Sequence, residues 1–479
     1  MSKNSALLLL INQLSPPEKA YFKKNFFQFT GGKEVNYKVI FDRILEYGDD
    51  DNNFLSQYIS SSQISRVKSY LYEQLLSSLE SYAVGSDQNF QIKRSLNKCY
   101  LLFQKGLIVQ AKQWVEKTIL QAHNSFSYHS LLEAYSIKRK ILMTELNLKE
   151  MKEIILEEEK IHLLLEEIRD MDKLYLQVVV NSFTKGNIIN RTELEKYKEE
   201  FGFIVKMKVE QFNSVIAISQ YYRIASIYYT NIRNLELSCE NAWMRVELLE
   251  ANPLFIENDH QNYINALNNA IDISIFTSRI IEAEKLSIKL KNFKPKSLFY
   301  IQRKNIRYCI TRMQIDVYKG VKKSHDEMIK SALTFLHSES DFLRKDERVE
   351  MYFLLSALLF NNGDYKNSKT EIVKFLAEPL SDIRIDSQCY MRLMLIYIYF
   401  TQGEYEYLEN LIKNTHRFLR NKNFLYGTEK FLLDFIKGQI ENKLRKKSFL
   451  REINNYKQKL DQVIEMEGDV SFGKFIHFN

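Results

Sequence analysis

The residues best suited to bind a ligand are polar side chains that recur along one face of otherwise apolar helical segments. In the basic segment 297–318, Arg303 and Arg307 are four residues apart, and Gln314 follows seven residues later. An α-helix places residues with these spacings on one face. Because an arginine can bind a carboxylate through two parallel hydrogen bonds, this segment predicts a ligand-binding surface.

Two preceding segments carry similar polar residues. Asn265, Asn268 and Asp272 follow the spacing i, i+3, i+7, and an asparagine amide can hold a peptide backbone because it both donates and accepts hydrogen bonds. Gln220 and Arg223 lie among four tyrosines. The opposite interpretation is that these polar groups are solvated, or buried with partners inside the protein. We expect the following residues to contact a protein or peptide partner: Gln220, Arg223, Asn265, Asn268, Asp272, Arg303, Arg307 and Gln314.

Positive charge gathers in two parts of the chain. The net charge is +8, and residues 291–330 hold 11 Lys and Arg against 3 Asp and Glu, whereas residues 410–479 hold 14 against 8. A short basic run in the second part is a candidate contact for nucleic acid or an acidic partner, although a solvated turn is the simpler interpretation. This run consists of Lys443, Arg445, Lys446, Lys447 and Arg451.

Motifs for catalysis, cofactors or metals are weak. Gly31-Gly32-Lys33 lacks the spacing of a phosphate-binding loop. The acidic run 49–53 begins like a calcium loop, but Phe54 and Ser60 stand where that loop needs Gly and Glu. No HExxH or GxSxG motif occurs. We therefore expect no cofactor, no metal and no enzyme activity; an active site assembled from distant residues is the remaining alternative.

The cysteines and the apolar segments indicate where in the cell the protein is located. The four cysteines are far apart and form no CxxC pair, so we expect small buried residues rather than a disulfide framework or a metal site. They are Cys99, Cys239, Cys309 and Cys389. No stretch of 18 apolar residues occurs, and the run 6–11 is too short for a signal peptide. These features predict a cytoplasmic protein without membrane insertion, and abundant Lys, Asn and Ile indicate a bacterial source.

The elements that position these residues are predicted to be helices. The 479 residues include only 14 Gly and 5 Pro, and sheets need many tight turns built from both. Breaks recur 39 to 47 residues apart, which fits two helices and two short connections. This pattern predicts an all-α superhelical array of about nine antiparallel hairpins. The turns fall near Gly106, Asn147, Gly186, Arg233, Ser278, Gly320, Gly363, Gly403 and Lys446.

The clearest repeats are the segments 361–365 and 401–405, each a polar pair followed by Gly, an acid and Tyr. Around Gly363 the sequence resembles a tetratricopeptide repeat: packing residues of its first helix would be Tyr352, Leu355, Ser356 and Leu359, and Ser368 stands where the family prefers Ala. Ala111 matches the same position, whereas Leu408 departs from it. The resemblance covers three hairpins well, and it implies an α-solenoid of tetratricopeptide-like type, with a longer period than the family's own.

Three segments are expected. Residues 1–90 lack the repeat and predict a small helical bundle that caps the array; its first helix starts at Ser15-Pro16-Pro17-Glu18, which reads as a capping box, and ends near Phe29. Further helices are expected at 37–47 and 63–82. Residues 91–425 form the repeat array. Residues 426–479 form a basic C-terminal hairpin and cap.

The architecture favours a non-enzymatic scaffold or adaptor that binds a peptide segment or a folded partner in the concave groove of the array. The alternative is a nucleic-acid-associated regulator, similar in outline to bacterial regulators that join a helical head to such repeats. The head speaks against it, because residues 1–90 hold 9 Lys and Arg against 10 Asp and Glu. The partner, the pathway and the oligomeric state are not predicted.

Overall fold

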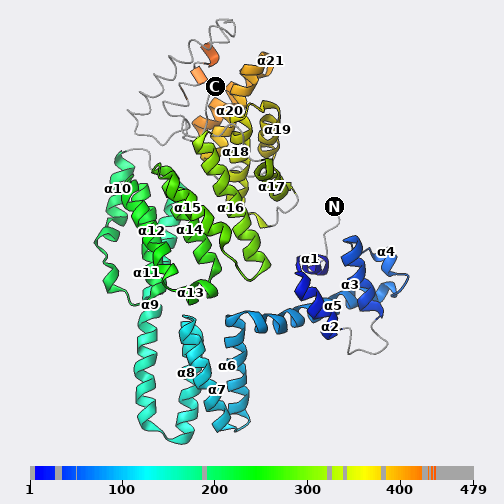
Figure 1. The fold of residues 1–479 in the computed structure, drawn as a ribbon, viewed down its shortest axis with the longest axis vertical. Helices are drawn as coiled ribbons and strands as arrows, with labels where there is room; N and C mark the ends of the chain where they lie inside the picture. The colour runs from blue at the N-terminus through cyan, green and yellow to red at the C-terminus, as the bar shows by residue number, and fades with distance from the viewer. Residues whose placement is uncertain are drawn as a thin grey trace. The chain divides into compact units, whose positions relative to one another are not determined.

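A computed structural model describes residues 6–26, 35–49, 51–185, 191–320, 326–337, 342–378 and 385–422, together with 430, 433–434 and 436–438. All regular secondary structure in these ranges is helical (Figure 1). The prediction of an all-α protein is therefore confirmed. No helix within the described ranges is long and apolar enough to cross a membrane.

The chain divides into two compact units. Unit 1 comprises Met1–Gly186, Phe201–Ile224 and Glu247–His260, and unit 2 comprises Asn187–Glu200, Ala225–Val246 and Gln261–Asn479. The first helices are α1 (Ala6–Gln13), α2 (Pro16–Phe26), α3 (Val35–Tyr47), α4 (Asn52–Leu55), α5 (Ser61–Ser86), α6 (Gln88–Gln104), α7 (Ile108–Asn124), α8 (Tyr128–Glu145), α9 (Leu148–Lys185) and α10 (Arg191–Phe201). Two short 3-10 helices follow, η1 (Gly202–Lys206) and η2 (Val209–Gln211). The remaining helices are α11 (Val215–Asn231), α12 (Leu235–Glu250), α13 (Pro253–Asn258), α14 (His260–Phe276), α15 (Ile280–Asn292), α16 (Leu298–Lys319), α17 (Asp326–His337), α18 (Lys345–Asn361), α19 (Tyr365–Leu376), α20 (Ile385–Gln402) and α21 (Tyr405–Asn421).

The N-terminal helices α1 to α4 pack against α5 and share one apolar core (Figure 1). The Glu18 half of the predicted capping box at the start of α2 is present: the backbone N–H of Ser15 donates to Glu18 Oε2 at 2.7 Å, and the Ser15 hydroxyl donates to the same oxygen at 2.7 Å. The helices expected at 37–47 and 63–82 correspond to α3 and α5. Helix α1 was not predicted; its apolar run buries Leu7, Leu8 and Ile11 in the bundle.

Most predicted turns carry a residue with left-handed backbone. They include Gly106, Arg233, Ser278, Gly363 and Gly403, with φ between 61° and 77°. The same hydrogen-bond pattern recurs at each of them, with the next N–H donating five residues back, as in Asp364 N to Leu359 O at 2.9 Å. This is the Schellman ending of a helix. Leu146, beside the predicted turn at 147, and Gly320 are also left-handed.

At several turns, the fifth residue after the left-handed residue is small and buried. Ala111, Ser238, Ala283 and Ser368 are all fully buried there. The hydroxyls of Ser368 and Ser238 each donate to the backbone carbonyl twelve residues earlier, at 2.9 and 2.8 Å. The larger Leu408 is also buried at this position. The recurring contact and the many packed helix pairs are compatible with a helical repeat fold.

Helix α9 differs from the predicted period. Residues 148–185 form one helix, whereas a period of about 40 residues would place a connection inside this range. The segment contains neither Gly nor Pro and is rich in Leu, Glu and Lys, which favour an uninterrupted helix. The turns near 186 and 446 lie outside the described residues. The nine hairpins, the solenoid and the boundaries at 90 and 425 stay predictions.

In unit 2, helix α18 packs against α16, α17, α19 and α20. Nearly all its residues are buried, and they belong to one apolar core that extends from Ile306 to Ile436. A helix with neighbours on all sides must bury any polar side chain that faces them. Helix α18 therefore buries the carboxylate around which the candidate site forms.

Candidate functional site

The predicted arginines of α16 bind a carboxylate of their own chain. Arg303 donates two parallel hydrogen bonds to Glu347 of α18, from Nη1 to Oε2 at 2.5 Å and from Nη2 to Oε1 at 2.6 Å. Arg307 places its Nε 2.7 Å from Glu347 Oε1. The carboxylate of Glu347 is fully buried, and both arginine side chains are less than 10% exposed. The arginine–carboxylate chemistry predicted for a ligand thus occurs inside the protein.

Glu347 also caps the helix that carries it. The backbone N–H of Arg344 donates to Glu347 Oε2 at 3.0 Å, three residues before it, as in a capping box. Arg303 Nη1 additionally donates to the carbonyl oxygen of Phe342 at 3.1 Å. Both interactions hold the chain that enters α18. Glu347 and Arg303 therefore fix the position of α18 against α16.

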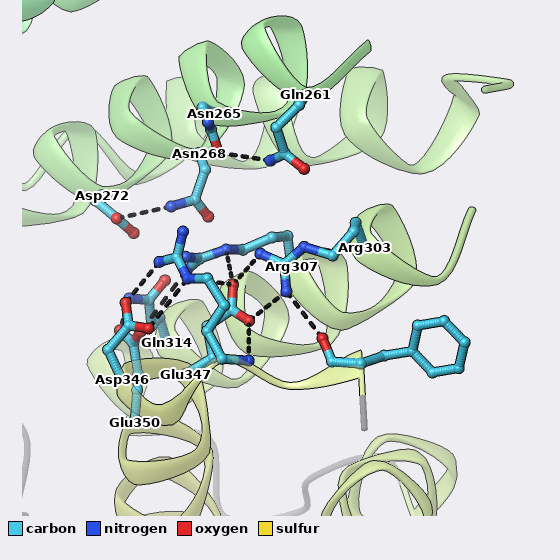
Figure 2. Close-up of polar contacts among 12 residues, drawn as sticks. Gln261, Asn265, Asn268, Asp272, Arg303, Arg307, Gln314, Asp346, Glu347 and Glu350 are labelled. Carbon is cyan, nitrogen blue, oxygen red and sulfur yellow. Dashed lines mark hydrogen bonds and ion pairs between the residues drawn. The ribbon is translucent and has the colours of Figure 1, made fainter. Parts of the chain in front are cut away.

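In this cluster, shown in Figure 2, Glu347 and Asp346 are partnered by arginines, which lower the pKa values of both carboxyl groups. Burial alone would raise the pKa of Glu347, but the hydrogen bond from Arg303 and the charge of Arg307 outweigh burial and lower it. Arg344 also binds Asp346, whose pKa is lowered despite burial by the hydrogen bond from Arg344. A buried carboxylate stays charged only when such partners replace its lost hydration.

Gln314 extends the cluster along α16. Its Nε2 donates to Oε1 of Glu350 on α18 at 3.0 Å. Arg307 Nη1 lies 3.8 Å from Glu350 Oε2, which is longer than a hydrogen bond. Arg307 therefore attracts Glu350 by charge and retains donor capacity at Nη1.

On α14, polar side chains pair along the helix. Asn268 Nδ2 donates to Asp272 Oδ2 at 3.1 Å, and Gln261 Nε2 donates to Asn265 Oδ1 at 2.9 Å. Figure 2 shows Asn268 and Asp272 on the α14 side of Arg307, opposite the carboxylates of α18. The polar residues of α14 and α16 thus face a common region within unit 2. We call Asn265, Asn268, Asp272, Arg307 and Gln314 the polar face.

Two carbonyl oxygens of the polar face have no hydrogen-bond partner. They are Asn268 Oδ1 and Gln314 Oε1, and both are buried from water. The orientation of each amide follows from chemistry, because Asp272 and Glu350 are acceptors and require the amide NH₂ groups to face them. An unsatisfied buried acceptor is unfavourable. Each of these two oxygens is therefore an unused hydrogen-bond acceptor.

The other predicted residues lie elsewhere. Gln220 and Arg223 belong to unit 1, where Gln220 Nε2 donates to Asp172 Oδ1 at 2.8 Å. The Arg223 guanidinium stacks 3.8 Å from the centre of the Tyr175 ring. Both side chains contact α9. The basic run of Lys443, Arg445, Lys446, Lys447 and Arg451 lies outside the described residues.

The sequence did not single out Glu347 or Glu350, the acidic partners on α18. The local signal was present: Glu347 stands three residues after Arg344, and Asp346 and Glu347 occupy the first turn of the helix, where acids are favoured. Nothing in that signal predicts the pairing with Arg303, which is 44 residues distant. All four cysteines are buried, as expected, and each is outside any disulfide bond.

Groups of three or more His, Cys, Asp or Glu side chains able to hold a metal ion are absent from the described residues. Comparison of the chain with models of known protein families and with curated proteins finds no match.

Proposed function

We propose that the protein is a non-enzymatic scaffold or adaptor that binds an extended peptide segment of a partner on the polar face of α14 and α16. One observation carries the proposal: the carbonyl oxygens of Asn268 and Gln314 are buried without partners beside Arg307, which can still donate at Nη1. Acceptors and a cationic donor on one face suit a ligand that has both N–H and C=O groups.

A peptide backbone is such a ligand. Its N–H groups would donate to the amide oxygens of Asn268 and Gln314, and a carbonyl oxygen would accept from Arg307. The buried ion pairs with Glu347 hold Arg307 in place, so little side-chain freedom is lost on binding. Helical-repeat arrays commonly bind partners on the surface of their first helices, and this analogy of fold supports the same location.

The test is a selection of peptides from a displayed random library on the full-length chain, followed by calorimetry with the enriched sequence. Asn268→Ala combined with Gln314→Met removes both acceptors and should raise Kd at least tenfold, about 1.4 kcal/mol. The matched control is Gln402→Met, an amide change at an exposed position of α20, which should leave Kd unchanged. Thermal melting checks that each variant is folded.

Either of two results would overturn the proposal. One is that no peptide is enriched by the wild-type chain over an unrelated helical protein. The other is that the folded double variant binds the enriched peptide as tightly as the wild type does.

A further inference from the structure

Unit 1 exposes an unusual set of aliphatic side chains at two of its turns. They belong to the α6–α7 and α8–α9 connections and the adjoining helix ends. Leu146 is 79% exposed, Val109 66%, Leu148 65% and Met143 60%. We call this set the tip patch; it consists of Leu101, Leu107, Val109, Met143, Leu146 and Leu148.

The two turns lie at the same end of one stack of helices. Consecutive helices from α6 to α9 pack against each other, and α6 also packs against α8. Figure 1 shows both turns at one extremity of this stack. Side chains this exposed at the ends of hairpins protrude from the surface and do not line a groove.

The fold does not require leucine at the turns. Leu146 has a left-handed backbone with φ 52°, a conformation that costs a leucine about 1–2 kcal/mol and glycine nothing. Leu107 is the N-cap of α7 and makes no side-chain capping bond, although serine would supply one. Two exposed leucines thus occupy positions where glycine and serine would favour the fold, which points to a role at the surface.

Uncompensated positive charge surrounds the tip patch. Glu145 and Glu150 are neutralised by Lys112 and Lys138, at N–O distances of 2.8 and 3.0 Å. Four further exposed lysines make no ion pair with the described residues. Near the two connections, the remaining negative charge is that of Glu153. These lysines are Lys105, Lys140, Lys149 and Lys152.

From these features we infer that the tip patch docks on an anionic lipid surface. The leucines, Val109 and Met143 would enter the boundary between headgroups and acyl chains, while the lysines meet the negative headgroups. A protruding, aliphatic surface suits a bilayer; a helical peptide would instead need an apolar groove. The site is in unit 1 and does not depend on the peptide-binding proposal.

The experiment is vesicle flotation of the full-length chain. One set of vesicles is phosphatidylcholine alone, and the other contains about a third phosphatidylserine, a strongly anionic surface. The wild type should float with the anionic vesicles and much less with the neutral ones, and added salt should weaken binding. Equal recovery with both vesicle types, or none with either, would overturn the inference.

Leu107→Ser combined with Leu146→Gly tests the apolar contribution without harming the fold, because both changes suit the local backbone. This variant should bind anionic vesicles at least tenfold more weakly while its melting temperature is unchanged or higher. The control is Leu120→Ser, a 63% exposed leucine of α7 that lies about 18 Å along the helix from the turn; its binding should equal that of the wild type.

A second pair of variants separates insertion from charge alone. Lys105→Glu with Lys149→Glu should also weaken binding to anionic vesicles. If this pair abolishes binding while the leucine variant binds as the wild type does, the leucines do not enter the bilayer and the inference is wrong. If the wild type ignores vesicles but binds an acidic protein through the same residues, lipid is the wrong partner.

Discussion

At the residue scale, the central feature is the fully buried carboxylate of Glu347. It pairs with two arginines and caps the N-terminus of its own helix. The sequence correctly indicates that Arg303 and Arg307 share a face and that arginine suits a carboxylate. It gives no means of finding the acid, which belongs to another helix 44 residues away. Whether these arginines also contact a partner stays a prediction.

Neutralising Glu347 should destabilise unit 2 severely. Glu347→Gln removes the charge that pairs with both Arg303 and Arg307 and leaves Arg307 with the more distant Glu350; removing one partner of a buried pair costs about 3–5 kcal/mol. Urea unfolding of the variant and the wild type measures this difference. Glu350→Gln is the control, because Glu350 is 3.8 Å from Arg307 and partly exposed; about 1 kcal/mol or less is expected. Similar losses in both variants would contradict the assigned role of Glu347.

The same carboxylate should make stability depend on pH. The pKa of Glu347 in the folded chain is below its ordinary value of 4.5, so its contribution is present above pH 4.5 and is lost as the pH falls through the folded pKa. The free energy of unfolding of the wild type should therefore approach that of Glu347→Gln below pH 4.5. Urea titrations from pH 7 to pH 3 provide the comparison. A difference that stays constant over this range would show that Glu347 is not the titrating group.

At the element scale, the sequence predicts the helix endings better than the helix lengths. Gly363 and Gly403 mark their turns because a left-handed residue is needed there, and Arg233 and Ser278 adopt the same backbone without glycine. The length of α9 was not predicted, since a repeat period assumes a break where the residues from 148 to 185 contain no residue that ends a helix. Local turn chemistry is therefore readable from sequence, whereas a repeat period alone does not show where a helix continues.

Two glycine substitutions test the turn argument. Gly363 has φ 77° and a Cβ there would meet no atom within 4 Å, so Gly363→Ala should lose about 1–2 kcal/mol through backbone strain alone. Gly85, in α5, also has open space but no left-handed backbone. Gly85→Ala should gain about 0.5–1 kcal/mol from helix propensity. Thermal unfolding of the two variants should therefore shift in opposite directions, and shifts of the same sign would refute the argument.

At the scale of the whole molecule, composition was enough to predict an all-α chain, and the predicted turns that fall within the described residues coincide with helix ends. The composition could not predict two compact units whose boundaries interleave along the chain. Interleaving assigns Gln220 and Arg223 to unit 1 and the other six predicted residues to unit 2, although all eight were predicted from helical spacing. Sequence spacing places residues on a face of a helix, and tertiary contacts decide which faces belong together.

The most direct test of the peptide-binding account is photo-crosslinking of the library-selected peptide, carrying a photoreactive group, to the wild-type chain. Mass spectrometry then identifies the linked residues. The account predicts links on α14 and α16, near Asn268 and Gln314, and fewer links when unlabelled peptide competes. Specific links confined to unit 1, with none on α14 or α16, would contradict it.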